Sequence, residues 1–208
     1  MTTSERGGPT ADEALARLVA GNHRFLQGVC SRPGLQRETL ADLARGQRPY
    51  ATVLGCSDSR VPPEQVFDAG LGELFVVRVA GNVFSPEVAG SLQYAGAHLE
   101  TPLFVVLGHG GCGAVGAALA ARYEDARHRS RIQTLVDSIL PGLPEFDAGL
   151  SPQARLARAV ECNVRWTVRQ VLTTPEGRGR VAEGRMRIVG AVYEIETGRV
   201  AWLPDERA

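Results

Sequence analysis

The sequence contains no lysine, and all of its 23 basic residues are arginines. Without lysine the chain cannot form a Schiff base with a carbonyl substrate, and it has no P-loop lysine for binding nucleotide phosphates. The 23 basic residues are balanced by 23 acidic residues, so the formal net charge is zero. A chain with this balance lacks the strongly basic surface that binds nucleic acids or anionic membranes. We therefore expect neither of them as a partner.

Cysteine is also scarce, with 4 residues in a chain of 208. This number is too small for a disulfide scaffold in a chain of this length. No apolar run approaches the ~18 residues that a membrane-spanning helix needs. The opening MTTSERGGPTADEAL has no basic segment followed by an apolar run, as a signal peptide would have. We therefore expect a cytoplasmic protein whose thiols are free for metal binding or catalysis.

The length favours a single domain over residues 10–208, preceded by a disordered tail at residues 1–9. A capping box at Thr10 opens an amphipathic helix that extends to Leu26. The apolar face of this helix must cover an apolar surface, either the sheet of its own chain or a partner subunit.

Short apolar runs alternate with helical segments along the rest of the chain. Three of these runs are continuous, as expected for parallel strands buried on both faces, and a hairpin closes the chain. The expected strands are Ala51–Gly55, Leu74–Ala80, Leu103–Leu107, Ile188–Ile195 and Val200–Leu203, and the expected helices are Glu87–Leu99, Ala114–Ala121, Ser130–Leu140 and 151–173. The alternation predicts an α/β fold with a central, mainly parallel sheet flanked by helices.

The third apolar run ends in a glycine-rich turn, GHGGCGAVG, which fits two templates. Gly108, Gly110 and Gly113 have the G-x-G-x-x-G spacing of a dinucleotide-binding turn. That fingerprint needs an acidic residue about 20 positions later, at the end of a second strand. The corresponding segment, EDARHRSR, is polar and helix-like, with no strand before it. The turn also contains His109 and Cys112, which a dinucleotide site does not use, so we favour metal binding.

A second loop with reactive side chains, CSDSR, follows the first apolar run. Because parallel strands end at the same edge of a sheet, this loop and the glycine-rich turn should meet there. Together they supply Cys56, His109 and Cys112, a Cys₂His set that suits zinc. Three protein ligands leave the fourth tetrahedral position to water, which is typical of catalytic zinc. The alternatives are a structural zinc site with Asp58 as a fourth ligand, and buried cysteines that only pack.

Asp58 and Arg60 belong to the same loop and are spaced so that both can face one side of it. A neighbouring guanidinium lowers the pKa of a carboxylate and keeps it ionised. The alternative is a surface ion pair of little energetic value. Since Cys56 is only two residues away, we favour a role for the pair beside the metal.

These segments resemble those of the β-class carbonic anhydrases. CSDSRVPPE is similar to the first signature of that family, and GHGGCGAV is similar to the second, with the same H-x-x-C spacing. GELFVVRVAGN, SLQYA and LVAGNHRF also resemble family segments, so the resemblance is strong over residues 14–120. Beyond them, only the closing strand IVGAVYEIETG aligns readily.

The resemblance implies a carbonate dehydratase, a zinc lyase that converts CO2 reversibly to bicarbonate and a proton. The Cys₂His set would bind one zinc ion per chain, and hydroxide formed from its bound water would attack CO2. Asp58, held by Arg60, would orient that water. Gly111 and Gly113 would allow the tight turn and the close approach of the substrate. A hydrolase of carbonyl sulfide or carbon disulfide on the same scaffold is the alternative.

The resemblance also implies a four-stranded parallel sheet with an added antiparallel edge strand, assembled into homodimers or homotetramers. Residues 10–45 would then form an N-terminal helical arm that packs on the partner subunit. In part of the family, bicarbonate in a nearby pocket favours an inactive form, and Arg78 and Tyr94 match positions of that pocket. The position of its tryptophan is occupied by Val53 here. We therefore expect bicarbonate to inhibit this protein weakly or not at all.

Overall fold

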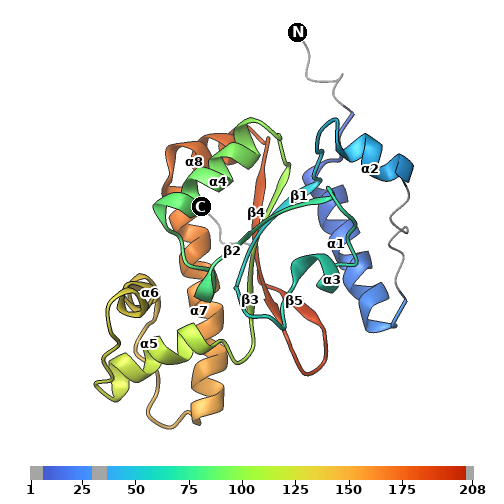
Figure 1. Ribbon diagram of the computed structural model, residues 1–208. Helices are drawn as coiled ribbons and strands as arrows, with labels where there is room; N and C mark the ends of the chain where they lie inside the picture. The colour runs from blue at the N-terminus through green and yellow to red at the C-terminus, as the bar shows by residue number, and fades with distance from the viewer. Residues whose placement is uncertain (1–6, 30–36, 205–208) are drawn as a thin grey trace.

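A five-stranded sheet runs through the middle of the structure, with helices on both of its faces (Figure 1). The computed structural model describes residues 7–29 and 37–204. The strand order is β2-β1-β3-β4-β5, in which the first four strands are parallel and β5 is antiparallel to β4. The strands are β1 (Ala51–Gly55), β2 (Leu74–Arg78), β3 (Leu103–His109), β4 (Arg187–Tyr193) and β5 (Val200–Trp202). The expected α/β fold, including its antiparallel edge strand, is confirmed.

The helices are divided unequally between the two faces of the sheet (Figure 1). One face is covered by α1 (Ala11–Leu26) and the short α3 (Pro63–Val66), and α2 (Arg37–Leu43) lies near α1. The helices on the other side are α4 (Pro86–Ala97), α5 (Gly113–Tyr123), α6 (Arg131–Ile139), α7 (Pro152–Thr173) and α8 (Pro175–Ala182). Among the described residues, no helix is both long and apolar enough to cross a bilayer.

The central strands β1 and β3 are buried along their whole length, which explains their continuous apolar sequences. Successive side chains point to opposite faces, so each strand contributes to two cores. Val53 and Val105 pack in the cluster that contains α1, whereas Leu54 and Val106 pack in the cluster that contains α7. Such burial on both faces is expected where helices cover both sides of a parallel sheet.

The second expected strand is two residues too long. β2 ends at Arg78, and the chain then enters a 3₁₀ turn at Ala80–Asn82. Gly81 and Asn82 have φ angles of 69° and 45°, in the left-handed region, so the extended conformation cannot continue through them. The other expected strands and helices begin and end within two residues of the observed ones.

Helix α8 was not expected from the sequence. It contains Gly177 and Gly179, which are poor helix formers. The hydroxyl oxygen of Thr174 accepts a hydrogen bond from the Gly177 N–H at 3.0 Å and caps the helix. Local propensity argues against this helix, and its cap and its packing against α4 and α7 favour it.

Helix α1 packs on its own chain through its apolar face. Ala14 and Leu18 are completely buried in a cluster that includes Phe67 and residues of β1, β3 and β4. The Asn22 side-chain amide donates hydrogen bonds to the carbonyl oxygens of Val66 and Gly198, at 3.1 and 2.9 Å. These contacts join α1 to α3 and to the β4–β5 turn, so α1 is part of this domain.

Because this face of α1 is used within the chain, only the opposite face remains for a partner subunit. Val19 is 46% exposed on the outer side of the helix, and Leu26, at its C-terminal end beside Gly198, is 41% exposed. The expected contact of residues 10–45 with a partner therefore stays a prediction, and residues 30–36 of this segment lie outside the described part of the chain. Residues 1–6 of the expected disordered tail also lie outside it.

Gly21 tests the docking of α1, because a Cβ atom there would lie 1.8 Å from the carbonyl oxygen of Phe67. Alanine is the better helix former, but overpacking costs about 1–3 kcal/mol, so we expect Gly21→Ala to lower the free energy of unfolding by about that amount. Gly90→Ala, at an exposed position of α4, is the control, since a Cβ atom there would meet nothing within 4 Å. It should gain up to about 1 kcal/mol. Urea denaturation measures the free energy of unfolding of both variants. An increase in both would contradict the packing of α1 against Phe67.

Candidate metal centre

The structure brings Cys56, His109 and Cys112 together at the carboxyl ends of β1 and β3. Cys56 follows β1 directly, His109 is the last residue of β3, and Cys112 precedes the first turn of α5. All three side chains are buried, and one potential ligand atom from each lies within 4.8 Å of the others. The parallel pairing of β1 with β3 accounts for this meeting, because Gly55 is the register partner of Leu107.

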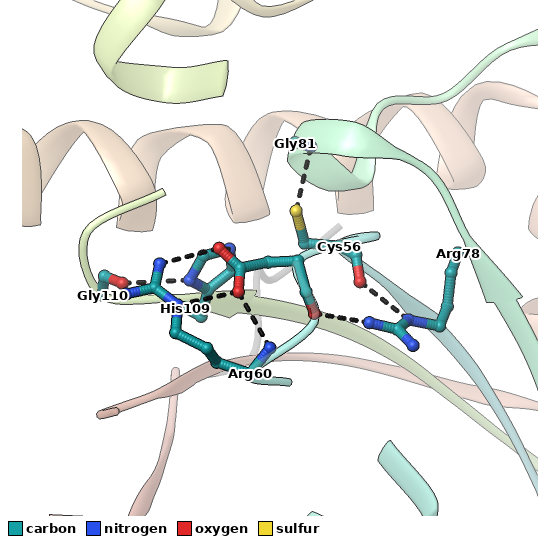
Figure 2. Close-up of polar contacts among 7 residues, drawn as sticks. Cys56, Arg60, Arg78, Gly81, His109 and Gly110 are labelled. Carbon is teal, nitrogen blue, oxygen red and sulfur yellow. Dashed lines mark hydrogen bonds and ion pairs between the residues drawn. The ribbon is translucent and has the colours of Figure 1, made fainter. Parts of the chain in front are cut away.

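The His109 ring is oriented by its own turn (Figure 2). Nδ1 lies 3.0 Å from the carbonyl oxygen of Gly110, which can only accept, so Nδ1 carries the proton. The lone pair is then on Nε2, which is buried and has no hydrogen-bond partner among the described residues. A buried acceptor without a partner is costly, and metal-binding histidines commonly donate the other N–H in this way. The His109 ring therefore fits a metal ion bound at Nε2.

The two cysteines differ in their ionisation. A hydrogen bond from the Cys112 thiol lowers the pKa of Cys56 well below its usual range despite the burial of the thiol. Donating that hydrogen bond raises the pKa of Cys112, and burial raises it further. Cys56 is therefore the more acidic of the two thiols. Since zinc binds thiolates, binding would displace the proton of Cys112.

Asp58 and Arg60 form a two-pronged ion pair at the edge of this site. Arg60 donates from Nε to Oδ1 at 2.9 Å and from Nη2 to Oδ2 at 2.7 Å. These bonds hold the pKa of the Asp58 carboxyl well below its usual range. Asp58 Oδ2 lies 3.9 Å from His109 Nε2. Both carboxylate oxygens are bonded to Arg60, so Asp58 borders the Cys₂His set without completing it.

Comparison with known proteins identifies the family of the chain. Residues 51–200 match the sequence profile of the carbonic anhydrases. Carbonic anhydrase 2 of Mycobacterium tuberculosis is 40% identical over 185 residues, which cover 88% of this chain and 87% of that protein. The carbonic anhydrase of Mycolicibacterium smegmatis is 41% identical over 188 residues, covering 88% of each. The chain belongs to the carbonic anhydrase family.

Solved structures place this carbonic anhydrase in the β class. A tetrameric β-carbonic anhydrase from Sordaria macrospora superimposes with a TM-score of 0.75 at 26% identity, covering 95% of this chain and 98% of that one. The Coccomyxa β-carbonic anhydrase superimposes with a TM-score of 0.70 at 27% identity, covering 91% of this chain and 86% of that one. The resemblance seen in the sequence is confirmed, and the protein is a carbonate dehydratase, a lyase. The homodimer or homotetramer expected for it stays a prediction.

Arg78, expected in a bicarbonate pocket, supports the active-site loop of this carbonic anhydrase. From the end of β2 it donates from Nε to the Cys56 carbonyl at 2.9 Å and from Nη2 to the Asp58 carbonyl at 2.5 Å (Figure 2). Tyr94, on α4, packs instead against the rings of Phe75 and His98. The pocket therefore stays a prediction, and Arg78 has a second role that its sequence position did not reveal.

Sequence reasoning also missed the group that contacts the Cys56 sulfur. The backbone N–H of Gly81 donates to Cys56 Sγ at 3.3 Å (Figure 2). The available signal was the glycine–asparagine pair directly after an apolar run, which marks a turn. On α7, an asparagine at position 163 occurs within a largely apolar helix face, and its amide contacts this same turn.

Gly111 and Gly113 were both expected to allow the tight turn between His109 and Cys112 and the approach of the substrate, and the structure gives them different backbone conformations. Gly111 has a φ angle of 66°, whereas Gly113 is in the ordinary helical region at the start of α5. We expect Gly111→Ala to lose about 1–2 kcal/mol of stability and to weaken zinc binding, because an L-residue is strained in the left-handed region. Zinc competition with a chromogenic chelator and urea unfolding measure both effects.

The matched control is Gly113→Ala, since a Cβ atom at either glycine meets nothing within 4 Å. This variant should keep zinc affinity and stability close to those of the wild type. Equal zinc affinity in the two variants would show that the left-handed turn does not determine how the ligands are presented.

Proposed function

We propose that this chain catalyses the reversible hydration of CO2 to bicarbonate and a proton, with one zinc ion per chain bound by Cys56, His109 and Cys112. The observation that carries the proposal is the buried Nε2 of His109, which has no hydrogen-bond partner among the described residues and lies in a group with the thiols of Cys56 and Cys112 whose potential ligand atoms are all within 4.8 Å of one another. When bound, zinc supplies the positive charge that makes water a nucleophile near neutral pH. The family membership and this donor set support the same activity.

Asp58 is the group we assign to orienting the nucleophile. Two thiolate ligands offset the charge of Zn2+, so water is acidified less than by three neutral histidines, and a hydrogen-bond acceptor beside it becomes valuable. The Asp58 carboxylate is ionised because Arg60 bonds both of its oxygens. Its Oδ2 is 3.9 Å from His109 Nε2, close enough to the ligand set to accept a hydrogen bond from the attacking water or hydroxide and so aim its lone pair at CO2.

The glycine-rich turn leaves its side of the site open to a small substrate. Gly111 and Gly113 are both exposed, and a Cβ atom added at either would meet nothing within 4 Å. Arg60 is 55% exposed and borders the same loop, which leaves the site reachable from solvent.

Stopped-flow CO2 hydration with a pH indicator, on protein of known zinc content, tests the function. We expect zinc near one per chain and clear hydration activity in the wild type. Asp58→Ala should keep its zinc and lose about 10- to 100-fold in turnover, because only a group beside the ligands is removed. Unchanged turnover in this variant would eliminate the orienting role of Asp58.

The matched control is Asp42→Ala, which removes the exposed ion pair between Asp42 of helix α2 and Arg45. It should alter neither zinc content nor turnover. A wild type that binds zinc but hydrates no CO2 at neutral or alkaline pH would contradict the proposal. Hydrolysis of carbonyl sulfide or carbon disulfide by that same sample would favour the alternative function.

We also propose that bicarbonate inhibits this enzyme weakly or not at all. Val53 is completely buried in β1, at the position where the inhibited members of the family have their pocket tryptophan. Two N–H groups of Arg78 already donate hydrogen bonds to the carbonyl oxygens of Cys56 and Asp58. Hydration rates measured at increasing bicarbonate, at constant ionic strength, should fall only as mass action requires. A steep loss below neutral pH that bicarbonate deepens would contradict this proposal.

A further inference from the structure

The Ala80–Asn82 turn forms one wall of the metal centre. Its Gly81 N–H is the backbone donor to Cys56 Sγ, at 3.3 Å. The turn is tightly enclosed, because a Cβ atom at Gly81 would lie 2.9 Å from Ile139 Cδ1 and 3.0 Å from Ala114 Cβ. Gly81 and Asn82 are both left-handed, which is uncommon for two successive residues. A turn of this kind persists only where its surroundings hold it in place.

Helix α7 holds this turn with two buried polar side chains. Asn163 Nδ2 donates to the carbonyl oxygen of Gly81 at 2.8 Å, and Thr167 Oγ1 donates to the carbonyl oxygen of Asn82 at 3.2 Å. The two donors are four residues apart and so lie on one face of the helix. Asn163 is 1% exposed and Thr167 is completely buried. Gly81 is thus bonded on both sides, through its N–H to the ligand sulfur and through its C=O to α7.

Burying Asn163 at this position is energetically unfavourable apart from that hydrogen bond. Its Oδ1 is buried and, among the described residues, has no hydrogen-bond partner. An unsatisfied buried polar atom costs about 1–3 kcal/mol. The neighbouring positions on this face are occupied by Val160 and Val164, so an apolar side chain would suit the environment better. The Asn163 amide therefore contributes its hydrogen bond to the Ala80–Asn82 turn and does not improve the packing of α7.

The same face of α7 also contacts the strand that presents the histidine ligand. A Cβ atom at Gly108 would lie 2.5 Å from Val164 Cγ2 and 3.3 Å from Val160 Cγ1, so the helix packs directly on the backbone before His109. The same face of α7 thus contacts both segments beside the metal site. Its valines pack on β3 at Gly108, and its polar side chains bond to the Ala80–Asn82 turn. The position of β3 relative to this turn therefore depends on a single helix.

We propose that Asn163 and Thr167 are positioning residues for the metal ligand Cys56. By fixing the Ala80–Asn82 turn, they aim the Gly81 N–H at the sulfur, and this hydrogen bond reduces the electron density that the thiolate gives to the metal. Groups that orient ligands in this way tune both the affinity and the electronic properties of a metal site. The inference rests on the proposed zinc site, and it adds α7 to the parts of the chain that determine its properties.

The test compares zinc and cobalt binding by full-length variants. Asn163→Ala and Thr167→Val should each raise the zinc dissociation constant, by about 10-fold for Asn163→Ala and less for Thr167→Val, measured by chelator competition. In the cobalt-loaded protein, the thiolate-to-metal charge-transfer band should move to longer wavelength as the N–H···S bond is lost. Thr167→Ser keeps the hydroxyl donor and should restore both values toward those of the wild type.

Thr101→Val is the matched control for loss of a buried hydroxyl. Thr101 is 1% exposed, and its hydroxyl is 2.8 Å from that of Thr52, at the opposite end of β1 from Cys56. This variant should lose about 1 kcal/mol of stability while keeping the zinc affinity and the cobalt spectrum. If Asn163→Ala and Thr167→Val bind metal as Thr101→Val does, the inference is overturned and the zinc site stands. A wild type that binds no zinc overturns both.

Discussion

The parallel pairing of β1 with β3 is the constraint on which the site depends. Cys56 is separated from His109 by 53 positions in the chain, and only the shared carboxyl edge of two adjacent strands brings them within bonding distance of one ion. Both strands are buried on both faces, so α1 and α7 can hold them from opposite sides. A change in register would move the loops apart and turn every side chain of the shifted strand to the other core.

Arginine supplies the multidentate contacts around this site. Arg60 bonds both oxygens of Asp58, and Arg78 spans the carbonyls of Cys56 and Asp58. Arg122 does the same farther away, where it donates to the carbonyls of Leu140, Leu143 and Pro144 after α6. A planar guanidinium with several fixed donors can bridge acceptors in this way, whereas an ammonium group acts as a point charge. The chain without lysine therefore fixes its active-site loop at several points with few residues.

The metal centre is also defined by groups that carry no ligand atom. The Gly81 N–H contacts one sulfur, the Gly110 carbonyl sets the tautomer of the histidine, and the Arg60 guanidinium keeps Asp58 ionised. Each comes from a different segment: α7 holds the Ala80–Asn82 turn, a hydrogen bond to the Tyr193 carbonyl of β4 holds Gly110, and Arg60 lies in the loop that follows β1. The chemistry of the three ligands thus depends on how firmly the surrounding backbone is packed.

The sequence by itself determined the family, the α/β class with its mainly parallel sheet, and the two segments that carry the candidate ligands. Its information was local: Cys56, Asp58 and Arg60 are in one loop, His109 and Cys112 are in one turn, and buried strands are continuous apolar runs. It could not determine that β2 ends before a left-handed Gly81–Asn82 pair, that α8 forms despite two glycines, or that Arg78 supports the Cys56 loop. Only the tertiary structure decided these, because each depends on residues distant in the chain. The same holds for α7, whose Asn163 is an ordinary polar residue in the sequence and reaches the Ala80–Asn82 turn only when the helix packs across the sheet.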